Sequence, residues 1–524
     1  MIVHNTIASI LAALAVPGVR RAVLLAKSDQ RIHYRRAWHQ LTQHFVVPSL
    51  VMDDKGEPMI VTGNPMPPVV HFIAYSKLSR PDSTRLLAEL NPDLIIADEV
   101  HSLASVTSSR SLRWLRFMSS RPGIKFAGWS GTLLDKSIRN MAHLSAHALG
   151  YGSPMPINPN DVEAWASVLD PSPQPDRTSS IARGIFRAFG DSRSVPDDVA
   201  MLGIALPKVR DGFQRRLSRT PGVITSMSTS SASSITVHER KLTVPAPVAE
   251  ALKSVRGWKR PDGEELVEAV EQARTARECG TGYFYYWIFG DEPRELIEEW
   301  FEKRRSFNCE LRERILNGEE YLDSRFLCER AAARYRQVPP YEGDLPVWKS
   351  VHWPAWEAIR DKVKHTQGVE WIDPFFVNDA AAWAREHRGI VWTLSNALGR
   401  RIAEVAGINY HGGGPDAEKY NHAETGKQSI VASIKAHGEG RDQLQYRFSR
   451  QLIAEMPSGA KTINQLLGRL CRRGQPEDEV LTWVYLHHYE ARDALRKAVR
   501  GAEFVEQMTP SQSLLLAADF TFEV

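Results

Sequence analysis

The sequence of 524 residues has few of the features that mark secreted, zinc-binding or membrane-spanning proteins. It contains only four cysteines, and no two of them form a C-x-x-C pair. This spacing argues against a disulfide framework and against a structural zinc site, so a reducing compartment is expected. No apolar run approaches the roughly 18 residues that a membrane-spanning helix needs, so we expect no membrane partner.

A strong excess of one charge is also missing. Lys and Arg number 66 against 62 Asp and Glu, which leaves a formal net charge of +4. That balance argues against a basic tail that coats nucleic acid, but it is compatible with a charged groove. Near the start, "TIASILAALAVPG" has the apolar core of a secretory signal, yet the preceding "MIVHN" carries no Lys or Arg. We therefore expect an ordinary buried helix there.

Short apolar segments alternate with helical stretches in the first part of the chain (1–150). They are "RAVLLAKS" (21–28), "PVVHFIAYSKL" (68–78), "DLIIADE" (93–99) and "IKFAGWSGT" (124–132). Strands of this kind, separated by helices, predict a parallel α/β sheet that is covered on both faces. Ligands of such sheets bind at the carboxyl ends of the strands, where Asp98, Glu99 and the segment 130–132 would meet.

The later part of the chain changes in character several times. Residues 151–180 are rich in proline and serine and predict an irregular excursion, and "STSSASS" (228–234) predicts a hinge. Residues 245–375 are charged and helical, and within them we interpret "GYFYYWIFG" (282–290) as a buried face rather than a base-stacking platform. A second set of strands is expected in "GIVWTLS" (389–395), "AGINYHGGG" (406–414), the start of "QSIVASIKAHGEGRDQLQ" (428–445) and "EVLTWVYLHH" (479–488).

These patterns predict the α/β fold class, with two parallel-sheet domains in tandem and a helical insertion between them. The expected boundaries are 1–235 for the first domain, 236–375 for the insertion and linker, and 376–524 for the second domain. No internal repeat of the length found in solenoid proteins occurs in the sequence.

An aspartate–glutamate pair at the end of a buried strand has a specific use in phosphoryl transfer. Mg²⁺ prefers oxygen ligands and keeps several waters, so one carboxylate can hold it, usually through water. The second carboxylate can orient or deprotonate the water that attacks the γ-phosphate. The alternative for Asp98 and Glu99 is a helix N-cap, where acidic residues are favoured in any case.

A glutamine and two arginines lie close together in "QLLGRLCRRGQ" (465–475). If this segment is a helix, Gln465, Arg469 and Arg472 share one face at i, i+4 and i+7. Such a face suits the oxygens of a triphosphate, and an arginine placed on the transferred phosphoryl group accelerates its transfer. A solvated basic helix is the alternative, but Gly468 and Gly474 are poor residues for a merely structural helix.

The series "DEVH", "SGT" and "QLLGRLCRRGQ" resembles motifs II, III and VI of the superfamily 2 helicases and translocases, the DEAD/DEAH-like proteins. Its last member is most similar to the Swi/Snf-like branch and to phage-encoded relatives. "VLLAKS", "GIVWTLS" and "HGEGRDQLQ" fit motifs Ia, IV and V, so the resemblance covers most of the chain outside 240–375. It implies two RecA-like domains, ATP and Mg²⁺ as cofactors, and the cytoplasm of a bacterial or phage-infected cell.

The resemblance also implies a role for each matching residue. Asp98 would coordinate Mg²⁺ through water, and Glu99 would be the catalytic base. Arg472 would be the arginine finger, Arg469 a second phosphate contact, and Gln465 a contact to the γ-phosphate or its water. Nucleotide state would be sensed and transmitted by His101, Ser130, Gly131, Thr132, Gly440 and Asp442. For His101, the alternative is a histidine packed beside the strand end.

The family needs a phosphate-binding loop, G-x-x-x-x-G-K-[ST], which this sequence lacks. The nearest approximations, "HAETGKQS" (422–429) and "PSGAKT" (457–462), miss required residues. Because "HNTIASILAALAVPGVRRAVLLAKS" matches the helix after the loop and the next strand, we expect this chain to begin at an internal methionine of a longer protein. Two alternatives stay open: a partner polypeptide supplies the loop, or the chain is a scaffold that has lost hydrolysis.

Nucleic acid is the partner that the resemblance implies, with duplex DNA favoured over RNA. The family grips the polynucleotide mainly through its phosphates, so little sequence preference is expected. Arg35, Arg36 and Lys77 are candidate contacts, with a solvated face as the alternative. Three functions therefore remain open: an ATP-driven translocase or remodeller, a catalytically incomplete scaffold that binds nucleic acid or protein, and a nucleotide switch that does not depend on DNA.

Overall fold

The computed structural model describes residues 2–52, 67–131, 134, 136–171, 184, 188–189, 199–225, 233–266, 268–337, 343–413, 428–438, 441 and 443–523. Three predicted site residues, Thr132, Gly440 and Asp442, lie outside the described residues. The chain forms two compact units. The first unit comprises Met1–Leu134, Ile138–Glu163 and Phe289–Thr366, and the second comprises Asp135–Ser137, Ala164–Ile288 and Gln367–Val524.

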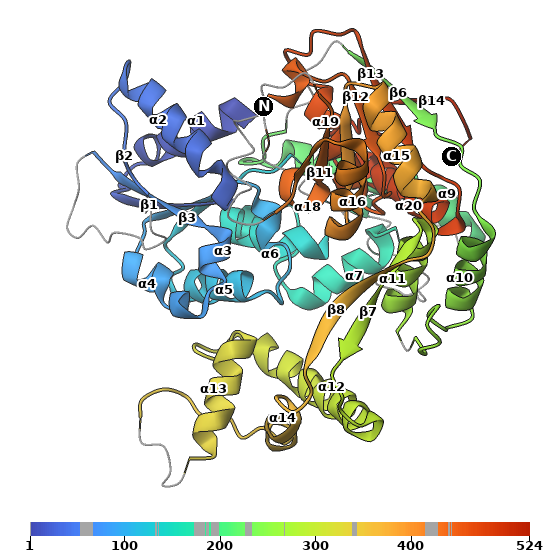
Figure 1. The fold of residues 1–524 in the computed structure, drawn as a ribbon. Helices are drawn as coiled ribbons and strands as arrows, with labels where there is room; N and C mark the ends of the chain where they lie inside the picture. The colour runs from blue at the N-terminus through green and yellow to red at the C-terminus, as the bar shows by residue number, and fades with distance from the viewer. Residues whose placement is uncertain are drawn as a thin grey trace. The chain divides into compact units, whose positions relative to one another are not determined.

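The first unit contains a parallel sheet in the strand order β2-β3-β1-β4-β5, of which Figure 1 labels β1, β2 and β3. Its strands are β1 (Arg21–Ala26), β2 (Ser49–Val51), β3 (Val69–Ala74), β4 (Leu94–Ala97) and β5 (Lys125–Gly128). Four of them fall within the apolar segments that predict strands. The expected α/β fold with a parallel sheet is thus confirmed for this unit.

Helices cover both faces of this sheet, which is why its strands are continuous apolar runs rather than alternating ones. On one face Leu24 and Ile96 pack against α1 (Ile2–Ala15) and α2 (Arg31–Thr42). On the other face Leu25 and Ile95 pack against Trp114 of α5 (Ser109–Ser120). The remaining helices of this part are α3 (Tyr75–Leu78), α4 (Leu86–Leu90), α6 (Arg139–Leu149) and the start of α7 (Pro159–Leu169), with short 3₁₀ turns η1 (Ser28–Gln30), η2 (Pro81–Ser83), η3 (Val100–Leu103) and η4 (Gly150–Gly152).

A helical segment from much later in the sequence belongs to the first unit as well. It contains α12 (Arg294–Leu316), α13 (Arg325–Tyr335) and α14 (Trp353–Ile359), and we refer to 289–366 as the helical segment. A cluster of tryptophans forms its core: Trp300, Trp348, Trp353 and Trp356. The predicted insertion 236–375 is therefore divided, with 289–366 in the first unit and its flanks in the second.

The second unit is built on a larger parallel sheet in the order β10-β11-β9-β12-β13-β6-β14. Its strands are β6 (Ser234–Glu239), β9 (Ile390–Thr393), β10 (Asn409–His411), β11 (Ile430–Ser433), β12 (Arg450–Ile453), β13 (Glu479–Val484) and β14 (Asp519–Phe520). β6 follows directly on the serine-rich stretch that predicts a hinge, and it pairs with β13 along its whole length.

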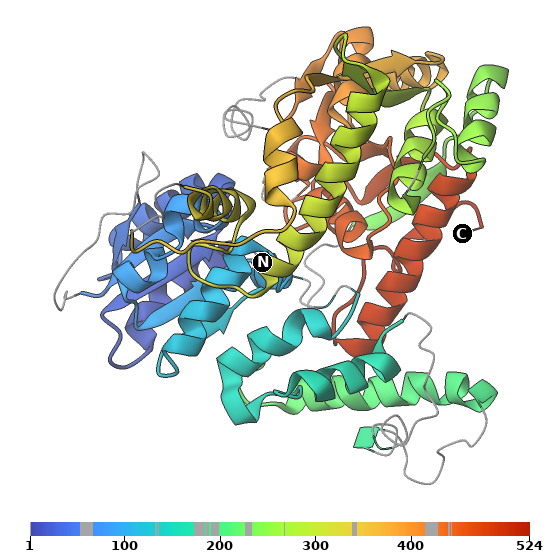
Figure 2. The ribbon, with the colours of Figure 1, turned by 90° about the horizontal axis from the view of Figure 1, so that it is seen from below.

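Helices again lie on both faces of this sheet. Trp392 and Ile453 pack against α19 (Ala460–Leu470) and α20 (Tyr489–Met508), whereas Val391 and Leu452 pack against α15 (Phe375–Glu386) and α16 (Asn396–Ala406). The other elements of this unit are α9 (Val199–Arg219), α10 (Ala246–Arg256), α11 (Ala269–Gly280), α18 (Ile434–His437) and η5 (Leu444–Tyr446). Figure 2 shows α9 against the end of α20, where Gln214 donates to the Glu506 and Thr509 carbonyls.

"GYFYYWIFG" forms a strand rather than part of a helix. It is β7 (Tyr283–Phe289), which pairs with β8 (His365–Trp371) in a two-stranded sheet. Tyr283 and Phe284 are buried as expected, and the rest of the strand is partly or fully exposed. The helical expectation is wrong here because an aromatic run is compatible with either structure, and β-propensity prevailed.

The described residues include all four cysteines and the helices named above. None of the helices in this part of the chain is both long and apolar enough to cross a membrane. The cysteines are all free, and only Cys309 is exposed.

Candidate functional site

The acidic pair of the first unit lies at the carboxyl end of β4, a fully buried strand paired on both sides. The Asp98 N–H donates to the Leu25 carbonyl at 2.8 Å, so the ladder continues for one more residue. Glu99 then adopts a left-handed conformation with φ of 53°, which non-glycine residues rarely take, and η3 begins. Backbone strain of this kind clusters at functional sites.

The Asp98 carboxylate is buried and held by donors from two directions. The Tyr34 hydroxyl of α2 donates to it at 2.8 Å, and the Glu99 N–H donates at 3.1 Å. The Tyr75 hydroxyl donates to the Asp98 carbonyl at 2.9 Å, which fixes the main chain as well. Burial raises the pKa of Asp98 to about 6, and the neighbouring charge of Glu99 adds to the rise against the lowering effect of the Tyr34 hydrogen bond.

Glu99, His101 and Ser130 form a connected group. The His101 Nδ1 lies 3.2 Å from a Glu99 carboxylate oxygen and 3.0 Å from the Ser130 hydroxyl. Ser130 follows β5, so this group joins the carboxyl ends of two adjacent strands. The side chain of Glu99 is 24% exposed, whereas Asp98 is buried, so Glu99 is the carboxylate that solvent can reach. We refer to Asp98, Glu99, His101 and Ser130 as the β4 acidic turn.

A close main-chain approach maintains this group. Val100 donates its N–H to the Trp129 carbonyl at 2.8 Å, and Trp129 donates to the Ala97 carbonyl at 2.9 Å. A Cβ atom on Gly128 would come within 2.7 Å of the Val100 side chain. Glycine is therefore needed at this position, because any larger residue would push the end of β5 away from η3.

The two neighbouring carboxylates of the β4 acidic turn suit a positively charged ligand. Within the described residues no group of three or more His, Cys, Asp or Glu is arranged to hold a metal ion. The pKa of Asp98 is raised chiefly by burial and further by the charge of Glu99, while the charge of Lys27 lowers it. A divalent cation supplies further positive charge, and Mg²⁺ keeps most of its waters and needs only one protein carboxylate. Asp98, whose two carboxylate oxygens accept the Tyr34 hydroxyl and the Glu99 N–H, is the residue that would hold Mg²⁺ here.

The second unit contains the glutamine and arginines of "QLLGRLCRRGQ". Gln465 and Arg469 lie in α19, and Arg472 follows its end, so one helical face does not carry all three. Arg469 is buried and donates to the Gly438 carbonyl at 2.9 Å and the Arg441 carbonyl at 2.8 Å. It thereby fixes the chain that follows α18, while Gln465 and Arg472 are partly exposed.

A second carboxylate lies at the matching edge of the second sheet. Glu455 follows β12 and accepts the N–H groups of Leu394 and Ser395 at 2.7 and 2.8 Å, where β9 ends and α16 begins. Burial raises the pKa of Glu455. The sequence gives no sign of this role, because nothing in "IAEMPSG" distinguishes an acid that caps a helix from one on the surface.

Several side chains of other elements gather near Glu455. Glu278 of α11 is buried and accepts the Tyr285 N–H at 3.3 Å, and the Tyr285 hydroxyl lies 3.0 Å from the Ser395 hydroxyl. Burial raises the pKa of Glu278 to about 7, with the charge of Glu455 adding to the rise. We refer to Glu278, Tyr283, Tyr285, Ser395 and Glu455 as the second-sheet carboxyl edge.

The candidate nucleic-acid contacts lie on the first unit. Arg35 and Arg36 of α2 are both exposed, and Lys77 of α3 forms an ion pair with Asp82 at 3.0 Å. A pair of arginines on a solvent-facing helix fits a phosphate contact and an ordinary solvated face equally well.

Comparison of the sequence with protein-family models and with curated proteins found no match. Any functional assignment therefore depends on the residues themselves, above all on the β4 acidic turn.

Proposed function

We propose that this chain is an ATPase of the superfamily 2 helicase type, which translocates on or remodels nucleic acid, with duplex DNA as the favoured substrate. The observation that carries the proposal is the connection of Glu99 to Ser130 through His101, with contacts of 3.2 and 3.0 Å. It joins the proposed catalytic base at one strand end to the next strand end, and by this contact a change at one would be transmitted to the other. A helix N-cap does not require this connection.

In the proposed mechanism the residues of the first unit act on water and charge. Mg²⁺ on Asp98 would neutralise charge on the β- and γ-phosphates. Glu99, reachable by solvent, orients the attacking water and takes its proton. His101 holds the Glu99 carboxylate and passes its position to Ser130. The rise in the pKa of Asp98 is expected to reverse when a cation binds.

The second unit contributes the other proposed groups. Arg472 and Gln465 are partly exposed and are the candidates for contact with phosphate oxygens. Arg469 donates to two carbonyls, so we assign it the positioning of Gly438 and Arg441 in addition to any phosphate contact. An arginine that supplies such carbonyl contacts is not free to act as a mobile finger, which favours Arg472 for that role.

Turnover and binding of nucleotide test the proposal. We expect ATP hydrolysis that duplex DNA stimulates, and we expect Glu99→Gln to lower turnover by at least about 100-fold while nucleotide binding is retained. Glu89→Gln is the matched control, since Glu89 is an exposed glutamate of the same unit. Absence of both nucleotide binding and hydrolysis in the purified protein would contradict the proposal.

The missing phosphate-loop motif favours a second candidate, a helicase-like scaffold that binds nucleic acid or a partner protein. It predicts DNA binding that is unchanged by ATP and by Glu99→Gln. A partner polypeptide that supplies the loop predicts turnover only when that partner is present. Turnover that added DNA does not stimulate would instead indicate a nucleotide switch.

A further inference from the structure

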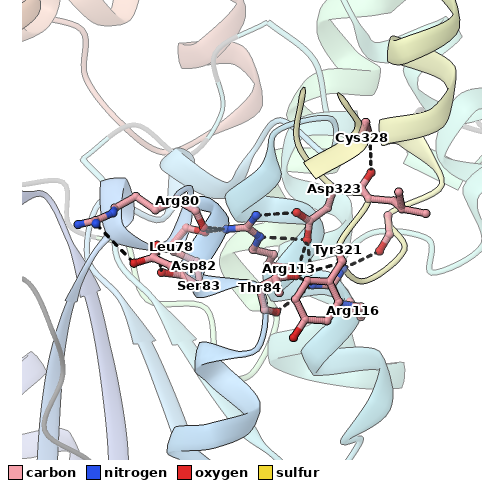
Figure 3. Close-up of polar contacts among 12 residues, drawn as sticks. Leu78, Arg80, Asp82, Ser83, Thr84, Arg113, Arg116, Tyr321, Asp323 and Cys328 are labelled. Atoms are coloured by element: carbon pink, nitrogen blue, oxygen red, sulfur yellow. Dashed lines mark hydrogen bonds and ion pairs between the residues drawn. The ribbon is translucent and has the colours of Figure 1, made fainter. Parts of the chain in front are cut away.

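A buried aspartate of the helical segment binds several side chains of the rest of the first unit. Asp323 is 0% exposed and lies in the turn between α12 and α13 (Figure 3). Arg113 of α5 donates to both of its carboxylate oxygens, with Nε at 3.0 Å and Nη2 at 2.6 Å. Arg116 donates to it at 2.9 Å and the Thr84 hydroxyl donates at 3.1 Å.

The same two arginines bind main-chain carbonyls around Asp323. Arg113 also donates to the carbonyls of Leu78, at 2.9 Å, and Arg80. Arg116 also donates to the Gly318 carbonyl at 2.8 Å and to the Thr84 carbonyl at 3.0 Å. Asp323 is therefore the common acceptor that orients both guanidinium groups, and we refer to these contacts as the Asp323 clamp.

The turn that carries Asp323 adopts a costly backbone conformation. Tyr321 has a φ of 62° and Gly318 a φ of 65°, and both values lie in the left-handed region. A tyrosine takes this conformation only where its surroundings enforce it. Buried ion pairs rarely add stability relative to well-packed apolar residues, and they are better at fixing a geometry. We therefore expect the Asp323 clamp to fix the orientation of the two arginines of α5 rather than to add stability.

The helix that the clamp orients also holds the β4 acidic turn. Near the start of α5, the Arg110 Nε donates to the Ser102 carbonyl at 2.7 Å, and the Ser111 hydroxyl donates to the Leu103 carbonyl at 3.1 Å. Both carbonyls belong to η3, the turn that carries His101. One rigid helix of 12 residues therefore binds η3 near one end and Asp323 further along.

We propose that Asp323 is a positioning residue for the β4 acidic turn and that the helical segment regulates this site through α5. The inference rests on the proposed function for its effect on turnover, but its structural part does not. Loss of the Asp323 carboxylate leaves Arg113 and Arg116 bound to main-chain carbonyls but without their shared acceptor, α5 shifts, and η3 loses the contacts that Arg110 and Ser111 make with it. His101 then no longer holds Glu99 in place. Any ligand or partner that moves the helical segment acts on hydrolysis by this route.

The test compares two carboxyl-to-amide substitutions in the same turn. Asp323→Asn removes the buried charge, and Glu320→Gln is the control, because Glu320 forms a surface pair with Arg85 at 3.2 Å. Hydrogen exchange is measured at the amides of Ser102 and Ala104, which donate to the Glu99 and His101 carbonyls. We expect Asp323→Asn to accelerate exchange there at least about tenfold, with β1 and β3 unchanged, and Glu320→Gln to have no effect.

Unchanged exchange at Ser102 and Ala104, or an equal rise throughout the first unit, would overturn the proposal. If Asp323→Asn does not fold, Arg116→Lys takes its place, since the 24% exposed side chain of Arg116 can be changed while the Arg113–Asp323 pair remains. The second readout is turnover, for which Asp323→Asn is expected to lower kcat and leave the KM for ATP unchanged. Faster exchange at η3 in a protein without any turnover would refute the proposed function and leave the positioning role intact.

Discussion

The two sheets each end in a carboxylate at a comparable place, and these two carboxylates have different surroundings. Asp98 follows the apolar strand β4, and Glu455 follows β12 with one alanine between. Asp98 accepts a tyrosine hydroxyl and adjoins a second acid, Glu99. Glu455 accepts two main-chain N–H groups at the start of α16. Asp98 also accepts one main-chain N–H, that of Glu99, whereas the two N–H groups on Glu455 fix the start of α16.

This difference shows that position at the carboxyl edge of a parallel sheet does not by itself assign a role. The donors decide it. Glu455 accepts two main-chain N–H groups from residues distant in sequence, whereas Asp98 accepts only that of its neighbour Glu99 together with the Tyr34 hydroxyl. Each of the two has an acidic neighbour, Glu99 beside Asp98 and Glu278 near Glu455, so the hydrogen-bond donors rather than the nearby acids distinguish them.

The largest effect is expected from the matched pair Asp98→Asn and Glu455→Gln. If Asp98 holds Mg²⁺, its substitution lowers ATP turnover by at least about 100-fold. Glu455→Gln keeps an acceptor oxygen and is expected to leave turnover nearly unchanged. Steady-state hydrolysis of both variants measures the contrast, and an equal loss in both would mean that the two edges share a catalytic role.

The next largest effect is a pH dependence of the free energy of unfolding, which arises from Glu278 in the second-sheet carboxyl edge. Because the pKa of Glu278 is raised from 4.5 to about 7, the native state keeps its proton to higher pH than the unfolded state does. The contribution of Glu278 to the free energy of unfolding is therefore fully present below pH 4.5, and about 3 kcal/mol of it is lost as the pH rises through 7. Denaturant titrations at pH 5 and pH 8 measure this fall, and Glu278→Gln is expected to remove most of it. An unchanged fall in Glu278→Gln would assign the pH dependence to other groups.

A smaller loss is expected when Glu455 is shortened. Glu455→Ala leaves the N–H groups of Leu394 and Ser395 without their acceptor, which costs about 1–3 kcal/mol in the free energy of unfolding. Glu455→Gln, which retains an acceptor, is expected to cost less. Urea denaturation of the two variants side by side decides whether the hydrogen bonds or the charge matter.

The smallest effect distinguishes the tyrosines around Asp98. The Tyr34 hydroxyl stabilises the ionised carboxylate, so Tyr34→Phe is expected to raise the pKa of Asp98 further, by about one pH unit or less. Tyr75→Phe is the control, because the Tyr75 hydroxyl donates to the Asp98 carbonyl instead. Carboxyl ¹³C NMR with labelled aspartate follows the titration, and equal shifts in both variants would count against the assigned role of Tyr34.

Much of the fold could be predicted from the sequence, because buried parallel strands are short apolar runs that stand out between helices. The segments around β1, β3, β4 and β5 show this. β6 could not be predicted as a strand, because a serine-rich stretch precedes it and its partner β13 lies far along the chain. The grouping of 289–366 with the first unit could not be predicted either, because sequence order alone does not show which domain an insertion packs against.

The candidate site could be predicted only where its residues directly follow a predicted strand. Asp98, Glu99 and His101 belong to one short stretch, and Ser130 follows the next strand. Tyr34 could not be found, because a tyrosine in a charged helix gives no sign that its hydroxyl reaches a carboxylate. Arg113 and Asp323 were missed for the same reason, since each is an ordinary charged residue until the fold brings them together.

The Asp323 clamp has a consequence for synthesis on the ribosome. Arg113 is made 210 residues before the aspartate that neutralises it. At about 5–20 residues per second, that interval lasts about 10–40 s. Throughout it the nascent first unit carries two guanidinium groups on α5 without their buried acceptor, so its last folding step has to wait until a large part of the second unit has already been translated.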